Sequence, residues 1–139
     1  MVAFLMVNSS DTKIIHCNIS DNSVNMGGIY IEDCSNIYVT NSIIRHCGTG
    51  ISISQSNLIF ISNCDFYLNT HYAISMRLAS NNITITKCDI KSNLRYGLYI
   101  EKDNYCNINE NNIFNHSIYG IYSKDGNCNA QYNWWGSAL

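Results

Sequence analysis

Residues 50–69 read GISISQSNLIFISNCDFYLN, and the architecture of the whole chain follows from this unit. A small residue opens the unit, apolar and polar residues alternate after it, and a second alternating run follows. Residues 73–93, AISMRLASNNITITKCDIKSN, repeat the same order. Alternation with a period of two is typical of a strand that buries one face. The unit therefore predicts short β-strands, in keeping with an apolar content carried largely by isoleucine and with ten tyrosines.

The unit recurs at intervals of about 22 to 25 residues, which is a period typical of solenoid repeats. Its first run begins with a small residue at positions 3, 28, 50, 73, 97 and 120. Its second run carries an apolar pair, and a third, shorter run carries one apolar residue. The pairs are Ile37/Val39, Ile59/Ile61, Ile83/Ile85 and Cys106/Ile108, with Thr12/Ile14 in the first unit, and the single positions are Ile19, Ile44, Phe66, Ile90 and Ile113.

Three strands in each unit describe one triangular turn of a β-helix. A turn of this length has one apolar stripe and no partner layer, so the turns must stack at about 4.8 Å to pair their strands and bury their isoleucines. We therefore predict an all-β protein, a right-handed parallel β-helix of about five to six coils that occupies residues 1–139 as a single domain. A leucine-rich repeat has a similar period, but it requires a leucine-dominated consensus and a helical half that this sequence lacks.

Small and polar residues mark the corners between the strands. The glycine or alanine that opens the unit predicts a tight corner with positive φ, or a close approach of the backbone. Asparagine recurs three residues after the last apolar position, at Asn22, Asn69 and Asn93, while Cys47 and His116 replace it in two units. Because asparagine tolerates the left-handed region and can hydrogen-bond the next coil, we expect an amide ladder at this corner.

The repeating unit and the end of the chain resemble a known family. The consensus G-I-x-I followed by N-I-x-I and C-x-I, and the string NAQYNWWG at residues 129–136, are similar to the parallel β-helix repeats of the NosD-like and carbohydrate-binding and sugar-hydrolase (CASH) group. The resemblance implies an extracellular, cell-surface or periplasmic location, although residues 1–139 contain no signal peptide. It also implies that residues 1–139 are a fragment, since further coils or domains usually flank such repeats.

Net charge and hydropathy argue against two classes of function. The net charge is −2, only 13% of the residues are charged, and no run of like charge occurs. Nothing therefore marks the chain as binding nucleic acid. The apolar opening at residues 1–7 is shorter than the roughly 15 residues that a signal peptide or a membrane span needs. No membrane span is therefore predicted in this segment.

The seven cysteines are an odd number, so a complete set of disulfides within one chain is impossible. Cys17, Cys64 and Cys88 share one repeat position, which predicts a ladder of small buried thiols rather than a metal site. Cys106 is expected to point inward. The others are expected at corners or on the surface: Cys34, Cys47 and Cys128.

Two aspartates are weak candidates for catalysis. Asp65 and Asp89 directly follow the cysteine ladder, so both should face outward, about 5 Å apart on adjacent coils. Stacked carboxylates can serve a sugar-processing site or bind calcium. The alternative is a solvated face whose charges are offset by Lys87 and Lys91. Because no third acidic residue joins the pair, the sequence favours a non-enzymatic protein without excluding an enzyme.

A copper site is a possibility that the resemblance implies. Isolated corner histidines are usually solvated, and methionines could join them in a site only if exposed. Met6 and Met76 align with inward isoleucines, so we predict no metal site. His16 is expected in a strand, and the histidines expected near corners are His46, His71 and His116; the methionines concerned are Met6, Met26 and Met76.

Tyrosines mark the expected ligand-binding face. Exposed aromatic rings interleaved with asparagine and serine suit stacking on sugar rings and hydrogen bonding to hydroxyls. An outward tyrosine also favours a strand for structural reasons alone. The candidates occupy two repeat positions, one within the first strand at Tyr30, Tyr99 and Tyr122, and one just before its opening small residue at Tyr72, Tyr96 and Tyr119.

Three functions remain open, and the fold does not choose among them. The favoured one is a surface module that binds polysaccharide, a surface protein or another extended partner along the tyrosine-bearing face, without a cofactor. The second is a fragment of a polysaccharide lyase or glycoside hydrolase with its site at Asp65 and Asp89, where calcium could take part. The third is a NosD-like periplasmic factor for the maturation of a metal centre.

Overall fold

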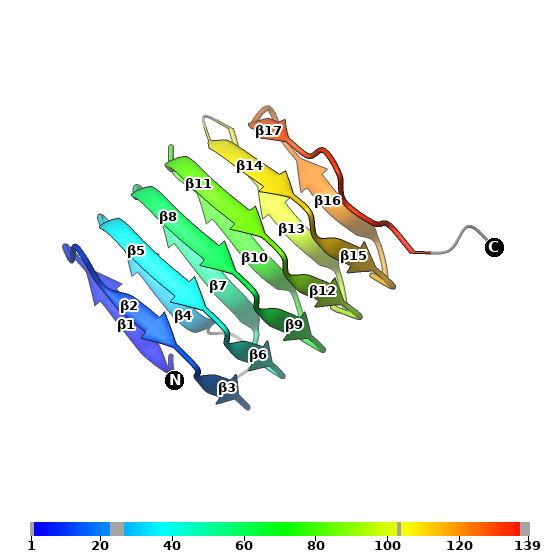
Figure 1. The fold of residues 1–139 in the computed structure, drawn as a ribbon, viewed down its shortest axis with the longest axis horizontal. Coiled ribbons are helices and arrows are strands. Elements are labelled where there is room, and N and C mark those ends of the chain that lie inside the picture. The colour runs from blue at the N-terminus through cyan, green and yellow to red at the C-terminus, as the bar shows by residue number, and fades with distance from the viewer. Residues whose placement is uncertain (1, 23–26, 103, 137–139) are drawn as a thin grey trace.

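The chain is an all-β parallel solenoid of about five turns (Figure 1). The computed structural model describes residues 2–22, 27–102 and 104–136. Within these ranges it contains no helix, and therefore no helix that is long and apolar enough to cross a membrane. The predicted parallel β-helix is confirmed, while Met26 lies outside the described residues.

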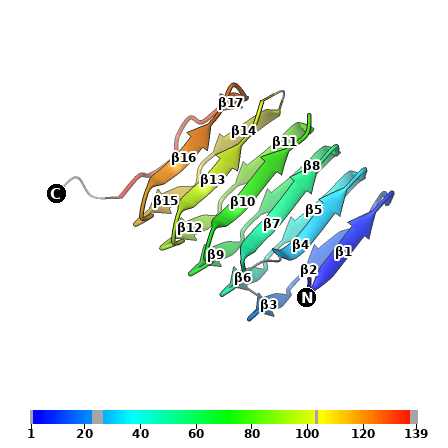
Figure 2. The ribbon, with the colours of Figure 1, turned by 180° about the vertical axis from the view of Figure 1, so that it is seen from behind.

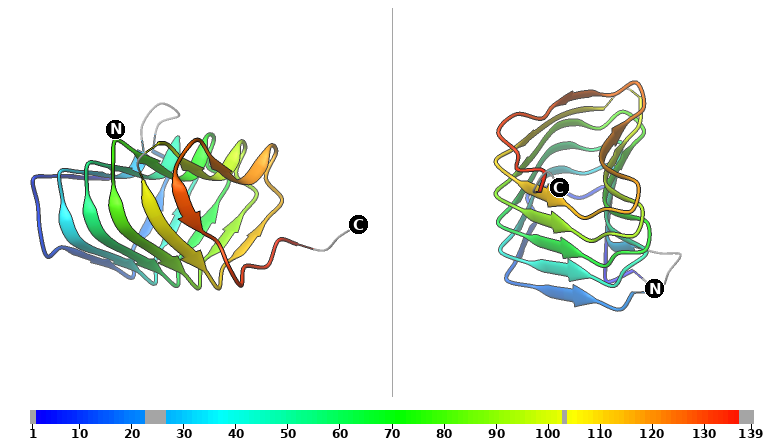
Figure 3. Two further views of the ribbon diagram at one scale, coloured as in Figure 1. Left: turned by 90° about the horizontal axis from the view of Figure 1, so that it is seen from above. Right: turned by 90° about the vertical axis from the view of Figure 1, so that its right-hand side faces the viewer.

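Three parallel sheets form the sides of the solenoid, and the coils lie one upon another along its axis (Figures 1, 2 and 3). Sheet A contains β1 (Phe4–Val7), β4 (Gly27–Glu32), β7 (Thr49–Ser54), β10 (Tyr72–Arg77), β13 (Tyr96–Ile100) and β16 (Tyr119–Ser123). Sheet B contains β2 (Lys13–Ile15), β5 (Ser35–Thr40), β8 (Asn57–Ser62), β11 (Asn81–Thr86), β14 (Tyr105–Asn109) and β17 (Asn127–Asn129). Sheet C contains β3 (Asn18–Ser20), β6 (Ile43–Arg45), β9 (Asp65–Tyr67), β12 (Asp89–Lys91) and β15 (Asn112–Phe114).

The register places equivalent repeat positions side by side, as the sequence period predicts. In sheet B, Ile59 pairs with Ile37 on one side and with Ile83 on the other. In sheet A, Ile51 pairs with Ile74. All five side chains have 0% exposure. Burying an isoleucine contributes about 1.5–3 kcal/mol relative to leaving it in water, so these ladders supply the main stabilisation of the interior.

Each coil turns at its corners through residues in the left-handed region, and most of them are not glycine. Asn63 has φ 52° and precedes Cys64, while Leu68 has φ 55° and precedes Asn69. The residue that follows points into the coil and is buried. Its side chain then bonds backbone groups that the turn leaves free, as Cys64 does when its thiol donates to the carbonyl oxygen of Ser62.

The glycine that opens the unit allows a close approach of two backbones, one of the two roles expected for it. A Cβ carbon on Gly50 would lie 2.4 Å from the carbonyl oxygen of Ala73, and one on Gly28 would lie 2.9 Å from that of Gly50. Positive φ is not the reason, because Gly136 is the only glycine in the described ranges with a positive φ.

The amide ladder expected at the corner after sheet C is present. The amide oxygen of Asn69 accepts the backbone N–H of Cys47 at 3.1 Å, and its amide nitrogen donates to the carbonyl oxygen of Ile44 at 3.2 Å. Asn93 repeats this on the next coil, where its oxygen accepts the backbone N–H of Asn69 at 3.1 Å. Each side chain thus satisfies a donor and an acceptor of the preceding coil.

Two cysteines are more deeply buried than the sequence suggested. Cys34 and Cys47 lie at corners, as expected, but their side chains point inward and not to the surface. The thiol of Cys34 donates to the carbonyl oxygen of Glu32 at 3.1 Å. Both cysteines follow a residue in the left-handed region, Asp33 and His46, and this conformation turns the next side chain into the coil.

Candidate functional site

The outer face of sheet A carries all six candidate tyrosines, in two rows. Each row is a set of residues that pair across neighbouring strands. The first row contains Leu5, Tyr30, Ser52, Ser75, Tyr99 and Tyr122. The second row contains Thr49, Tyr72, Tyr96 and Tyr119.

Five of the six rings form one stacked group, which we call the tyrosine cluster: Tyr72, Tyr96, Tyr99, Tyr119 and Tyr122. The ring centroid of Tyr72 lies 5.6 Å from that of Tyr96 and 5.0 Å from that of Tyr99. Tyr96 in turn lies 6.0 Å from Tyr119 and 5.4 Å from Tyr122. The planes of the stacked pairs differ by 4° to 28°.

Stacking within the cluster limits which ring surfaces a ligand can reach. Tyr96 stacks on four other tyrosines, so much of its ring is already in contact. Each such pair is worth about 0.5–1.5 kcal/mol beyond the area that it buries. Tyr119 is 55% exposed, and Tyr72 borders a groove described below. A ligand would therefore meet the cluster at its margins.

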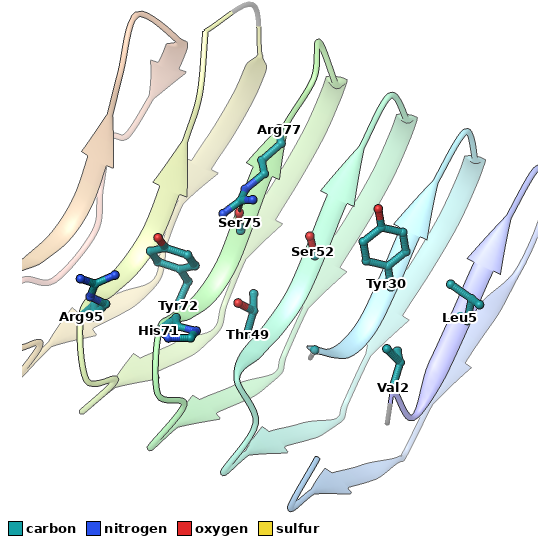
Figure 4. Close-up of a pocket in the computed structure, with 11 residues that line it drawn as sticks. Val2, Leu5, Tyr30, Thr49, Ser52, His71, Tyr72, Ser75, Arg77 and Arg95 are labelled. Carbon is teal, nitrogen blue, oxygen red and sulfur yellow. Dashed lines mark hydrogen bonds between the residues drawn. The ribbon is translucent and has the colours of Figure 1, made fainter. Parts of the chain in front are cut away.

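A groove lies where the first row of tyrosines is interrupted by two serines. Ser52 and Ser75 leave a hollow of about 740 Å³ on the outer face of sheet A. Tyr72 stands on one side of this hollow, and Tyr30 stands toward the other, where Leu5 and Val2 also line it (Figure 4). Tyr30, the candidate tyrosine outside the cluster, therefore belongs to the same surface, which spans the cluster and the groove.

Arg77 extends over the groove from the end of β10 (Figure 4). Its Nε donates to the hydroxyl of Ser75 at 3.2 Å, and its guanidinium carbon lies 5.7 Å from the ring centroid of Tyr99. Glu101 forms an ion pair with Nε at 3.8 Å. The side chain is therefore held in place while it remains about half exposed.

Tyr30 and Tyr99 flank Ser52 and Ser75 in the first row, and their phenol groups stay protonated at neutral pH. Burial raises the pKa of Tyr30 and of Tyr99, and the neighbouring carboxylates of Glu32 and Glu101 raise these pKa values further. A protonated phenol can donate a hydrogen bond as well as accept one.

The repeat region as a whole agrees with a known protein family. Residues 2–134 match the family described as "Right handed beta helix region". The chain belongs to this family. Neither the curated proteins nor the solved structures gave a match. The family description of this right-handed β-helix names a fold and no ligand, so its chemistry has to be inferred from its own residues.

On sheet C of the β-helix, the two aspartates proposed for catalysis pair in register. Asp65 on β9 lies opposite Asp89 on β12. The carboxylate of Asp89 is already engaged, since it accepts the side-chain amide of Asn112 at 2.7 Å and pairs with Lys91 at 3.3 Å. This arrangement supplies two neighbouring carboxylates, one of them partly neutralised.

The histidines of the β-helix lie apart from one another. His71 borders the groove, His46 is exposed at a corner, and His116 takes a position in the amide ladder. His16 was expected in a strand, but it lies exposed at the corner between β2 and β3 with φ 56°. Met6 and Met76 point into the core, as expected. Within the described residues, no group of three or more histidine, cysteine, aspartate or glutamate side chains could hold a metal ion.

The cysteines of the β-helix include two neighbouring pairs. Cys64 and Cys88 follow the adjacent strands β8 and β11 of sheet B, and Cys106 pairs with Cys128 across β14 and β17. The neighbouring thiol, together with burial, raises the pKa of Cys88 and of Cys106. Cys64, Cys88 and Cys106 are buried as predicted, whereas Cys17, expected in the same buried ladder, is only half-buried. Cys128 lies in β17 opposite Cys106 and not at a corner. All seven thiols are free.

Sequence reasoning missed the groove and its arginines. Arg77 and Arg95 line the groove, yet neither belongs to a motif that would mark it. The signal that could have found the site is the pair Ser52 and Ser75 within a row of tyrosines, because two small side chains in register leave space between larger neighbours.

Proposed function

We propose that this β-helix is a non-enzymatic module, located outside the cell or on its surface, that binds a glycan on the outer face of sheet A. The observation that carries the proposal is the tyrosine cluster, which directly adjoins a groove lined by hydroxyl groups on the same sheet. Sugar rings bind proteins through aromatic contacts to their C–H faces and hydrogen bonds to their hydroxyls. The location outside the cell follows from this choice of ligand and is part of the proposal.

The hydrogen-bonding groups around the groove match a polyhydroxylated ligand. Thr49 and Ser52 contribute hydroxyls, His71 contributes an imidazole, and the phenols of Tyr30 and Tyr72 stand at the two sides. A hydroxyl donates one hydrogen bond and accepts others, so this surface can serve both roles of each sugar hydroxyl.

The two other functions receive less support from the arrangement of their residues. Asp89 is occupied by Lys91 and Asn112, which fits a solvated and structurally paired carboxylate. The histidines are dispersed over corners, groove and ladder, so a site for metal-centre maturation would have to gather residues that lie apart.

Binding to a panel of oligosaccharides, measured by isothermal titration calorimetry, tests the proposal. Tyr72→Ala and Tyr119→Ala should each weaken binding roughly two- to tenfold, because an aromatic contact contributes about 0.5–1.5 kcal/mol. Tyr38→Ala is the matched control, since this outward tyrosine on sheet B stacks on Phe60 with a centroid distance of 5.0 Å. The affinity of the Tyr38→Ala variant for the oligosaccharides should be unchanged.

The aspartates distinguish the proposal from the enzymatic alternative. Asp65→Asn and Asp89→Asn should leave glycan binding intact. Cleavage of a polysaccharide by the unaltered protein that disappears in both aspartate variants would support the enzyme instead. The absence of binding to any member of the panel, or an equal loss in Tyr38→Ala, would contradict the proposed surface.

A further inference from the structure

Two cysteines at the end of sheet B lie close enough to be joined covalently. Cys106 on β14 and Cys128 on β17 are opposite each other in the strand register, and both side chains pack against the hydrophobic core. Residues in register on neighbouring parallel strands have Cα atoms about 4.8 Å apart. A disulfide spans Cα separations of roughly 4.4–6.8 Å. The pair can therefore be oxidised without rearrangement of the fold.

The strand that carries Cys128 is held on one edge. β17 is the terminal strand of sheet B and pairs with β14, whereas β14 lies between β17 and β11 (Figure 1). A disulfide also brings the two Cβ atoms to about 3.5–4.5 Å, slightly closer than the spacing of the strands. Within the described residues no strand pairs with the outer edge of β17, so this strand can make the small movement.

The two thiols of the pair differ in their access to solution. Cys128 is half-buried, while Cys106 is 6% exposed. A small reagent therefore meets Cys128 first. The neighbouring thiol lowers the pKa of Cys128, which favours the nucleophilic thiolate. The pKa of Cys106 is raised by the neighbouring thiol and by burial, so this residue keeps its proton until its partner has reacted.

Among the seven cysteines, the other five lack this combination of features. Cys64 and Cys88 are also neighbours on successive coils, but each is 1% exposed and lies in the interior of the stack. The remaining three have polar side chains as neighbours on the next coil: the backbone N–H groups of Cys17, Cys34 and Cys47 donate to Ser42, Ser56 and Asn69. Cys106 and Cys128 are thus the pair that a reagent in solution can reach.

We propose that Cys106 and Cys128 are a redox modification site, where a peroxide converts two thiols into a disulfide that fastens the last coil to the preceding one. The thiolate of Cys128 attacks one oxygen of hydrogen peroxide, the O–O bond breaks, and the leaving hydroxide takes up the proton that Cys128 released. The thiol of Cys106 then attacks the sulfenic sulfur, the S–O bond breaks, and the hydroxyl leaves with the thiol proton as water. Two thiols and one hydrogen peroxide give one disulfide and two water molecules.

The disulfide would close a loop that carries part of the tyrosine cluster. β16, with Tyr119 and Tyr122, lies between the two cysteines in the chain. A cross-link reduces the number of open conformations of the segment that it encloses. The site does not depend on the proposed glycan binding, although it would restrain two of the tyrosines on that surface. Disulfides persist outside the cell, which agrees with the proposed location.

Mapping of the cysteines after oxidation tests the proposal. The reduced native protein is treated with hydrogen peroxide, alkylated in denaturant and digested without reduction, and the peptides are identified by mass spectrometry. The expected product is a peptide pair linked through Cys106 and Cys128, and the free thiols should fall from seven to five per chain. Treatment with dithiothreitol should restore all seven.

Three variants assign the steps of the reaction. Cys106→Ser should stop at the sulfenic acid of Cys128, which dimedone labels. Cys128→Ser should form no disulfide, and because it alters a half-buried position it keeps the test decisive if Cys106→Ser fails to fold. Cys88→Ser is the matched control, since it removes one member of the buried pair. It should form the disulfide between Cys106 and Cys128 as readily as the unaltered protein does.

Hydrogen exchange measures the effect on the last coil. The backbone N–H groups of β16 and β17 should exchange about tenfold more slowly, or better, in the oxidised protein than in the reduced one. Peroxide should not slow them in Cys128→Ser. An unchanged rate in the unaltered protein would overturn the fastening of the coil.

Three products of the oxidation would overturn the site itself. They are a disulfide between Cys64 and Cys88 that forms equally fast, a sulfenic acid that persists on Cys128 of the unaltered protein, and a disulfide that joins two chains instead of closing within one. None of them would bear on the proposed glycan binding, which the oligosaccharide panel tests separately.

Discussion

The absence of a Cβ carbon at Gly50 allows two neighbouring coils to approach each other closely. A Cβ carbon there would lie 2.4 Å from the carbonyl oxygen of Ala73, a backbone atom that cannot rotate away. Ala73 holds the equivalent place on the next coil and is itself buried. The position therefore accepts a methyl group only where the neighbouring coil leaves room for it.

Gly50→Ala should lower the free energy of unfolding by about 1–3 kcal/mol, as overpacking of a close-packed interior does. Urea denaturation measures this loss. Gly120→Ala is the matched control, because its nearest neighbour is the Cγ2 atom of Ile113 at 3.1 Å, a side-chain atom that can shift. Its loss should be smaller, and equal losses would show that the backbone contact at Gly50 is not limiting.

Among the ladders, the one at the corner after sheet C contains a titratable member, His116. Its Nδ1 accepts the backbone N–H of Asn93 at 3.3 Å, and its Nε2 lies 3.0 Å from the carbonyl oxygen of Ile90. A neutral imidazole with the proton on Nε2 thus provides one acceptor and one donor, as the amide of Asn93 does. Burial lowers the pKa of His116, since the charged form is poorly solvated there.

Acidification should therefore destabilise the coil that His116 joins. An unfolded histidine has a pKa of about 6.5, and the folded pKa is lower, so the unfolded chain takes up the proton first. The stability is present above about pH 6.5 and is lost as the pH falls from there toward the folded pKa. Melting temperatures at pH 7.5 and 5.5 measure this. His116→Asn should lose less stability on acidification than the unaltered protein, and an equal loss would assign the effect to other groups.

The two rows of tyrosines on sheet A show how much of the arrangement of side chains the sequence predicts. Because stacked coils align equal repeat positions, the repeat alone places Tyr72 beside Tyr96 and Tyr96 beside Tyr119, as found. It does not predict that the rings stack on one another, or that Arg77 turns back over Ser75. Those conformations depend on neighbouring side chains that belong to other coils.

Corner residues show a second limit of prediction from the sequence. The inward direction of Cys34 depends on the left-handed conformation of Asp33, with φ 51°. An aspartate can adopt this conformation but does not require it, so the sequence leaves the direction of the next side chain open. At the carboxylates of sheet C, by contrast, the repeat period alone was sufficient to align Asp65 with Asp89.

Over the whole molecule, the reactivity of the seven free thiols measures whether a reagent in solution can enter the interior. Five are buried, while Cys17 and Cys128 are half-buried. In the native protein, iodoacetamide should modify Cys17 and Cys128, and the other five should react only after denaturation. The neighbouring thiol of Cys106 lowers the pKa of Cys128, which favours its reactive thiolate. Mass spectrometry of peptides locates the labels, and rapid labelling of Cys64 or Cys88 would contradict a closed interior.

The residues that line the groove come from neighbouring coils, so the width of the groove changes in steps of one repeat. Thr49 pairs with Tyr72, and excision of residues 49–71 would therefore join the chain in register while it removes the coil that carries Ser52. Ser75 would then lie next to Tyr30, and the opening would narrow by one strand spacing, about 4.8 Å. Loss or duplication of one repeat in the gene would thus change the size of an accepted ligand by a fixed increment, without the redesign of any loop.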